Sequence, residues 1–211
     1  MSDAAQRLVD ALIATAAEFY RRGWMWGTSG NLSVKLPGEP AAIVITGSGA
    51  SKGQLTRSDL AVLPAEVRPR YQWLGQAARK PSAETCIHQA MYEELPQVGA
   101  VLHVHTVATT VVALPRPPEG YLLIEGLEML KGWDIPWQGG RLAAELPVLA
   151  NQERMEDIAR EVRGLLRRGL ETPAFLVAGH GVTAWGKDLE QARNRLEISE
   201  FLCQALVQQR R

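Results

Sequence analysis

The class of fold is decided by the segment Val98-Gly99-Ala100-Val101-Leu102-His103-Val104-His105. Its run of valine, alanine and leucine favours a buried β-strand. Side chains two positions apart on a strand point to the same face, so His103 and His105 would project side by side. Two imidazoles in that arrangement can bind one transition metal. The alternative is a pair of polar residues that only ends the strand.

A third histidine extends the metal hypothesis. His180 follows the apolar run 174–177, and Gly179 and Gly181 flank it, which lets the backbone turn or approach another group closely. A single histidine in this setting is more often structural. Together with His103 and His105, however, it predicts a three-histidine site with one open position, as in catalytic zinc centres. Imidazole alone does not fix the metal, because zinc, iron, manganese, cobalt and nickel all accept nitrogen ligands.

The bulk composition predicts a single domain over residues 1–211 with a sizeable core. Lysine plus arginine equals aspartate plus glutamate, at 23 each, so nothing favours nucleic acid or an acidic membrane surface as a partner. The chain start lacks the pattern of a signal peptide, and no apolar run reaches the roughly 18 residues of a membrane span. Only two cysteines occur, Cys86 and Cys203, both in segments that read as helices. We therefore expect a cytoplasmic protein without disulfides.

Helical and strand patterns alternate along the chain, which predicts an α/β fold whose strand pairing cannot be derived from the pattern alone. Two stretches, 63–80 and 115–138, read as long and irregular; such loops are often functional, and disorder is an alternative for the first. We expect helix 151–168 to begin with Asn151 as its cap. The other expected helices are 4–22, 81–94, 107–114 and 189–208, and the expected strands include 41–46 and those that lead to His103 and His180.

Two glycine-rich loops offer backbone amides and small hydroxyl groups, which suit a phosphate. These loops are 27–33 and 46–52, and Lys52 could add charge to the second. Ser82, at an expected helix start, is a third candidate donor. Neither loop matches a nucleotide fingerprint, and each alone is more often a tight turn. Together with a metal site, the three elements suggest a small phosphorylated substrate.

Two carboxylates are candidates for proton transfer. Glu84 lies four positions before His88, so both would share one helix face, and Glu84 could be a base, a ligand or half of a surface pair. Glu128 is flanked by Leu127 and Met129, and apolar surroundings could raise the pKa of its carboxyl toward working pH. On its own, Glu128 is more typical of a solvated helix residue.

Taken in order, these segments resemble the class II aldolase/adducin family over roughly residues 8–206. The resemblance rests on Gly27–Ser33, Ile45–Gly49, Pro81–Glu84 with Cys86–His88, His103-Val104-His105 and Gly179–Gly181. It implies a three-layer α/β/α fold with a central, mostly antiparallel sheet, and a homotetramer with its zinc sites near subunit interfaces. It also implies one Zn²⁺ per chain and a small-molecule sugar phosphate as substrate. The implied zinc ligands are His103, His105 and His180, and the implied phosphate-binding residues are Gly30, Asn31, Thr46, Gly47 and Ser82.

The family contains aldolases, epimerases, dehydratases and the non-enzymatic adducin head. The segment Glu128-Met129-Leu130-Lys131-Gly132 resembles the Glu-Met-x-Lys-Gly element of its dehydratases from methionine salvage, which act on a methylthio-substituted ketose phosphate. This implies Glu128 as the principal acid/base and Glu84 as a second acid/base or a metal-proximal carboxylate. Eukaryotic relatives have a cysteine at the position of Glu84, and Cys86 should not inherit its role.

Two alternatives stay open. The first is a sugar-phosphate aldolase or 4-epimerase of the fuculose or ribulose phosphate type, because cleavage and dehydration share one enediolate. The second is a non-catalytic adducin-like module, although such heads need not keep the metal histidines, and this chain has all three.

Overall fold

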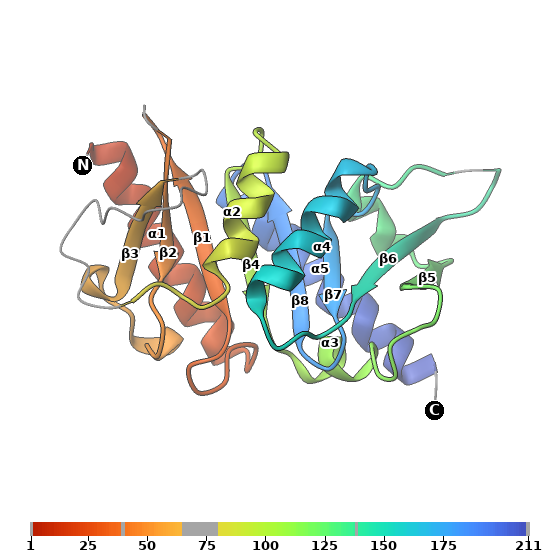
Figure 1. Ribbon diagram of the computed structural model, residues 1–211. Coiled ribbons are helices and arrows are strands. Elements are labelled where there is room, and N and C mark those ends of the chain that lie inside the picture. Colours follow the sequence, from red (N-terminus) through yellow and green to blue (C-terminus); the bar gives the residue numbers. More distant parts are fainter. Residues whose placement is uncertain (1, 39–40, 65–79, 138, 210–211) are drawn as a thin grey trace.

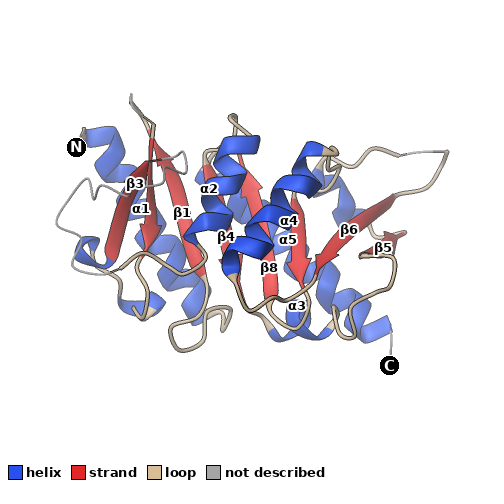
Figure 2. Ribbon diagram, in the orientation of Figure 1, coloured by secondary structure: helices blue, strands red, loops and turns tan. Residues whose placement is uncertain are grey.

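The computed structural model describes residues 2–38, 41–64, 80–137 and 139–209. Their strands form one eight-stranded sheet in the order β3-β2-β1-β4-β8-β7-β6-β5 (Figure 1; Figure 2). Neighbouring strands are antiparallel except β6 and β7, which are parallel, so the prediction of a mostly antiparallel sheet is confirmed. The strands are β1 Asn31–Leu36, β2 Ala42–Thr46, β3 Leu60–Pro64, β4 Ala100–Val104, β5 Tyr121–Glu125, β6 Ala143–Leu149, β7 Ala174–Val177 and β8 Gly181–Gly186.

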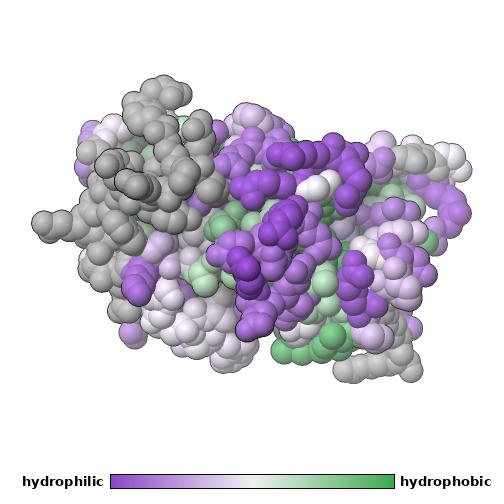
Figure 3. Space-filling model, viewed as in Figure 1, coloured by the Kyte–Doolittle hydropathy of each residue, from purple (hydrophilic) through white to green (hydrophobic). Residues whose placement is uncertain are grey.

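Helices cover both faces of the sheet, which gives the three layers (Figure 1). Helices α1 (Asp3–Arg21) and α5 (Leu189–Gln209) lie on one face, with the short α3 (Val107–Val111) packed against α5. Helices α2 (Thr85–Glu94) and α4 (Met155–Arg167) lie on the other, and hydrophilic side chains coat the outer surface there (Figure 3). Three short 3₁₀ segments complete the described chain: η1 Lys52–Gln54, η2 Arg57–Asp59 and η3 Glu128–Trp133. Within the described ranges, no helix combines the length and apolar character needed to cross a bilayer.

The sheet divides the buried apolar residues into two cores, and the division fixes where the histidines point. In β4, Leu102 and Val104 belong to the core under α1 and α5, whereas Val101 belongs to the core under α2 and α4. This alternation follows from the two-residue period of a strand. The side chain of His103 therefore lies on the α2 and α4 face. Each fully buried leucine or phenylalanine in these cores contributes about 1.5–3 kcal/mol through removal from water.

Local sequence signals set both ends of the first helix, α1. The Oγ of Ser2 caps α1 by accepting a hydrogen bond from the backbone N–H of Ala5 (3.3 Å). Leu12, Ala16 and Phe19 form its fully buried stripe. Just past the helix, Gly23 has a φ of 75°, a conformation that glycine adopts without strain. The expected helix 4–22 is thus confirmed to within one residue.

Three details of the sequence interpretation were wrong. The helix expected over 81–94 begins only at Thr85, and its N-cap residue is Glu84 and not Ser82. The stretch 115–138 is not wholly irregular, because it contains β5, in which buried Leu122 and Ile124 alternate with exposed Leu123. Asn151 does not cap α4; the helix begins at Met155 and its N-cap residue, Arg154, makes no side-chain cap hydrogen bond. Of the stretch 63–80, residues 65–79 lie outside the described residues.

The close approach of β4 and β8 generates a stability prediction. A Cβ at Gly181 would lie 2.2 Å from the carbonyl oxygen of Val104, so Gly181→Ala must push the two strands apart. We expect the free energy of unfolding, measured by urea denaturation of the metal-free protein, to fall by about 1–3 kcal/mol.

The matched control is Gly164→Ala in α4. Its Cβ would meet only Nη1 of Arg168, at an ordinary 3.7 Å, and alanine is the better helix former. This variant should gain about 0.5–1 kcal/mol. Equal stability of Gly181→Ala and the unmodified protein would contradict the strand-contact argument.

Candidate metal centre

Three imidazoles and one carboxylate converge at one end of the sheet. Glu84, His103, His105 and His180 each present a ligand atom, and these atoms all lie within 4.8 Å of one another. Oε1 of Glu84 is 2.9 Å from Nε2 of His180, and its Oε2 is 3.5 Å from Nε2 of His103. Nε2 of His103 lies 2.8 Å from Nε2 of His105. The structure thus brings together all three histidines that the sequence singled out, with Glu84 beside them.

Neighbouring elements position these side chains. The end of β4 pairs with the start of β8, so His103 and His105 lie beside the turn between β7 and β8 that carries His180. Gly179 makes this turn with a φ of 64°. Glu84 is the N-cap residue of α2, which covers this face of β4. Strand pairing alone therefore brings together ligands separated by about 75 residues of chain.

Burial keeps two of the three imidazoles, those of His103 and His105, in the neutral form. Burial lowers the pKa of His103, and burial together with the neighbouring histidines lowers the pKa of His105 to about 3. Nδ1 of His103 is hydrogen bonded to Oγ1 of Thr183 (3.0 Å), which orients the ring so that Nε2 faces the cluster. A neutral, oriented imidazole is the form that ligates a metal.

The carboxylate of Glu84 supplies the negative charge. Burial by itself would raise its pKa, but the electrostatic interaction with His103, the hydrogen bonds with His180 and Asn31, and the electrostatic interaction with His180 outweigh burial and hold the pKa well below its usual range. Glu84 is therefore ionised at neutral pH.

The donor set fits a divalent metal. Ligand atoms about 2.0–2.1 Å from a tetrahedral zinc ion are separated by roughly 3.3 Å, and three of the contacts in this group, at 2.8, 2.9 and 3.5 Å, lie close to that value. The three rings lie edge to face with centroids 4.7, 5.1 and 4.5 Å apart, so their nitrogens share one focus. This buried group of one glutamate and three histidines could hold a metal ion; histidine and carboxylate together do not select one metal.

The predicted phosphate-binding residues gather next to this centre. Oγ1 of Thr46 accepts a hydrogen bond from the backbone N–H of Leu32 (3.2 Å), which joins the ends of β1 and β2. Gly47 forms an isolated β-bridge with Pro81, and Oγ of Ser82 accepts from the backbone N–H of Glu84 (3.3 Å). Residues from all three predicted loops therefore line one region beside the metal centre.

Gly30 has no room for a side chain. Its φ is 72°, and a Cβ there would lie 2.7 Å from Cε of Met25 and 2.9 Å from the carbonyl oxygen of His103. The glycine thus lets the first loop lie directly against the strand that carries two of the candidate ligands.

Lys52 ties two of the loops together. Its ammonium group is buried and donates hydrogen bonds to the carbonyl oxygens of Thr28 (2.8 Å) and Ala50 (2.9 Å). Burial lowers the pKa of Lys52 to about 8, an effect that the charge of Glu84 partly opposes. The sequence had indicated only that Lys52 could add charge to its own loop; its bond to the other loop depends on tertiary structure.

Sequence reasoning paired the fourth histidine, His88, with Glu84 but did not predict its burial or its hydrogen bonds. His88 is fully buried behind Glu84 and hydrogen bonds to Asn31 and Ser33, at 2.5 and 2.7 Å. The one available signal was its spacing of four residues from Glu84 on the same helix.

Glu128 lies apart from the metal centre. It follows β5, which is four strands away from β4 in the sheet, a lateral separation of about 19 Å. The register places the start of β5 near the metal end of the sheet, so Glu128, beyond the end of β5, lies toward the opposite end. Its side chain is 74% exposed and forms an ion pair with Lys131 (2.5 Å). One chain therefore does not bring Glu128 and Glu84 together.

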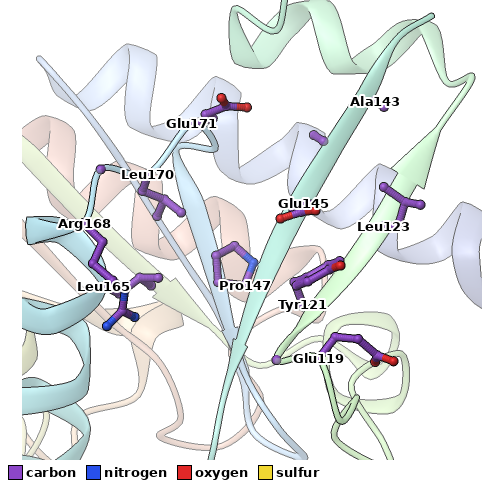
Figure 4. Close-up of a pocket in the computed structure, with 13 residues that line it drawn as sticks. Glu119, Tyr121, Leu123, Ala143, Glu145, Pro147, Leu165, Arg168, Leu170 and Glu171 are labelled. Carbon is purple, nitrogen blue, oxygen red and sulfur yellow. The ribbon is translucent and has the colours of Figure 1, made fainter.

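Another cavity lies away from the predicted site. It encloses about 620 Å³ between β5, β6 and the end of α4, and none of its lining residues belongs to the predicted site. Glu145, Pro147 and Tyr121 approach it from the strands, whereas Leu165 and Arg168 approach from α4 and the residues after it (Figure 4). Directly at the metal centre, Asn31, Glu84, His88, His103 and His180 help to enclose a space of only about 10 Å³.

Comparison with known proteins identifies the family. The family model described as the class II aldolase and adducin N-terminal domain matches residues 10–207. Methylthioribulose-1-phosphate dehydratase of Microcystis aeruginosa is 40% identical over 199 residues, which are 93% of this chain and 93% of that protein. The protein of the same name from Granulibacter bethesdensis is 37% identical over 205 residues, 95% of this chain and 91% of that protein.

A solved structure agrees with this assignment. L-fuculose-1-phosphate aldolase from Thermus thermophilus has a TM-score of 0.73 and 26% sequence identity, and the match covers 98% of this chain and 96% of that one. The fold, the ordered motifs and the sequence relatives all lead to one conclusion: this chain belongs to the class II aldolase/adducin family.

Proposed function

We propose that this chain is a zinc-dependent hydro-lyase that converts 5-methylthioribulose 1-phosphate to 2,3-diketo-5-methylthiopentyl 1-phosphate, a step of methionine salvage. The observation that carries the proposal is the buried group of Glu84, His103, His105 and His180 beside three phosphate-type loops. The names of the relatives at 37–40% identity support the choice of reaction.

We assign the metal site to His103, His105 and His180, with one zinc ion per chain. When bound, a zinc ion supplies Lewis acidity, which draws electrons from a carbonyl oxygen and acidifies the neighbouring C–H. Glu84, ionised and within 2.9 Å of His180, would be a fourth ligand or a second acid/base.

We assign the substrate phosphate to the loops that contain Gly30, Asn31, Thr46, Gly47 and Ser82. Backbone amides and hydroxyl groups there can donate hydrogen bonds to phosphate oxygens without adding bulk. The buried ammonium of Lys52 contributes positive charge from beneath two of these loops.

The reaction requires two proton movements. A base must remove the proton from C3, and an acid must protonate the C4 hydroxyl, because hydroxide is a poor leaving group. Water then departs, and the resulting enol tautomerises to the 2,3-diketone. We assign this proton transfer principally to Glu128.

Glu128 would act from a neighbouring subunit of a homotetramer. In its own chain it lies across four strands from β4 and is exposed, so it is free to enter the site of another copy. A shared site of this kind makes assembly a condition of catalysis, because a single chain would hold the metal ligands without the acid.

The first prediction concerns the metal. Elemental analysis of the purified protein should find about one divalent ion per chain, chiefly zinc. His105→Ala should weaken zinc binding at least 100-fold in a chelator competition, because it removes one of three nitrogen ligands. Cys86→Ser should bind zinc normally, since its thiol lies outside the cluster. A fully active protein without metal would contradict the proposal.

The second prediction separates dehydration from carbon–carbon cleavage. Incubation with 5-methylthioribulose 1-phosphate should yield the diketone and no aldehyde fragment. Glu128→Gln should lower kcat roughly 10²–10⁴-fold while zinc stays bound. Its control is Glu125→Gln, an exposed carboxylate paired with Arg141 in the same region, which should keep normal turnover. An aldehyde product would favour an aldolase, and normal rates for Glu128→Gln would remove it as the acid/base.

The third prediction tests whether sites are shared between chains. His103→Ala and Glu128→Gln proteins should each be nearly inactive. If the two are dissociated, mixed equally and reassembled, random pairing should restore about one quarter of the wild-type sites, each with its metal ligands from one chain and Glu128 from the other. Mixing without dissociation is the control. No recovery after reassembly would show that Glu128 does not act across an interface.

A further inference from the structure

Behind Glu84 lies a continuous chain of buried side chains. Oη of Tyr92 is 2.9 Å from Oγ of Ser33, which is 2.7 Å from Nδ1 of His88. Nε2 of His88 is 2.5 Å from Oδ1 of Asn31, and Nδ2 of Asn31 is hydrogen bonded to Oε2 of Glu84. We call these five residues the Glu84 support chain. None of them is more than 9% exposed, so bulk water does not compete for these bonds.

The direction of every bond in the Glu84 support chain can be derived from the placement of the Asn31 amide. The amide of Asn31 presents its Nδ2, which can only donate, to Oε2 of Glu84. Its Oδ1 then faces His88, and an amide oxygen only accepts. The hydrogen of His88 must therefore be on Nε2.

The directions of the other two bonds, between His88 and Ser33 and between Ser33 and Tyr92, follow in the same way. Burial lowers the pKa of His88 to about 3, so the ring is neutral and its Nδ1 has no hydrogen. Ser33 must then donate its hydroxyl hydrogen to Nδ1, which leaves its oxygen to accept from Tyr92. Burial raises the pKa of Tyr92, so the phenol keeps the hydrogen that it donates. A reversal of any single link would set two acceptors or two donors against each other.

We propose that the Glu84 support chain has this single direction, and that His88 and Asn31 are positioning residues that hold the carboxylate of Glu84 against the metal centre. Only the expected effect on catalysis rests on the proposed function; the hydrogen-bond directions and the effect on zinc affinity do not. His88 is not a ligand, since its bonds go to Asn31 and Ser33 and it is absent from the converging group.

The surrounding space supports a positioning role. The cavity bounded by Asn31, Glu84, His88 and the ligands His103 and His180 holds only about 10 Å³, about the volume that one water molecule requires. Glu84 thus has little room to rotate away from His180 while the chain is intact. Asn31 also has a second N–H on Nδ2, so the same amide could contact a substrate phosphate from the loop side.

The tautomer of His88 gives a test that needs no substrate. In zinc-loaded protein with ¹⁵N-labelled histidine, the imidazole spectrum should show His88 as the neutral Nε2–H tautomer, assigned from the signals lost in His88→Gln. An Nδ1–H tautomer or a charged ring would overturn the proposed direction, whether or not the chain is a dehydratase.

Kinetics and zinc affinity test the consequence. His88→Phe removes both hydrogen bonds, and we expect kcat to fall about 10–100-fold or zinc affinity to fall by a similar factor, with KM within about 3-fold. His88→Gln can still donate to Asn31 and accept from Ser33, so it should recover most of the loss. Full activity together with unchanged zinc affinity in His88→Phe would overturn the positioning role.

Met91→Ala controls for simple damage to the helix. Met91 is fully buried on α2 but belongs to the apolar core and not to the Glu84 support chain. The substitution Met91→Ala should lower the free energy of unfolding, because it leaves a cavity, but it should leave kcat and zinc affinity unchanged. If Met91→Ala loses as much activity and zinc affinity as His88→Phe, and His88→Gln recovers nothing, helix stability explains the effect and the proposal is wrong. Zinc affinity is measured without substrate, so this comparison stands even if the proposed reaction fails.

Discussion

The convergence of three imidazoles on one ionised carboxylate is the constraint on which the rest of the structure depends. A buried carboxylate is unfavourable unless hydrogen bonds and opposite charge stabilise it. Around Glu84 these come from Asn31, from the histidines and, in the proposed function, from the bound metal. The register of β1, β4 and β8 is the means by which the fold meets this requirement, because it places Asn31, His103 and the turn of His180 next to one another.

Burial has opposite outcomes for the histidines and for the glutamate of this centre, because only the glutamate gains interactions that outweigh it. Removal from water lowers the pKa of His103 and His105, whereas the interaction with His103 and the hydrogen bonds from His180 and Asn31 keep the pKa of Glu84 low. The centre thus presents one carboxylate and three imidazoles, a donor set that suits a divalent metal ion. Lys52 stabilises the adjoining loops from below and partly balances the charge of that carboxylate.

Much of the site could be predicted from the sequence, because its key residues carry local signals. His103 and His105 share a strand face by their spacing, and glycines mark the turn of His180. The family resemblance predicted the layered α/β fold, and the structure contains the mostly antiparallel sheet that it implied. Glu128 lies far from these residues in the structure, and no local sequence pattern could reveal that separation. The bond from Lys52 to Thr28 and the burial of His88 behind Asn31 also depend on contacts between distant segments.

The contact between Gly181 and Val104 limits how this centre can vary. A carbon added at Gly181 would lie 2.2 Å from the carbonyl oxygen of Val104, so β4 and β8 cannot move apart or slide without changing the position of His103 and of the residues that flank the strands, His105 and His180. Changes in reactivity among proteins of this architecture would then arise less from these strands than from the loops and the helix end that close over them. The paired strands fix where a metal ion would bind, whereas the surrounding loops decide which substrate reaches it.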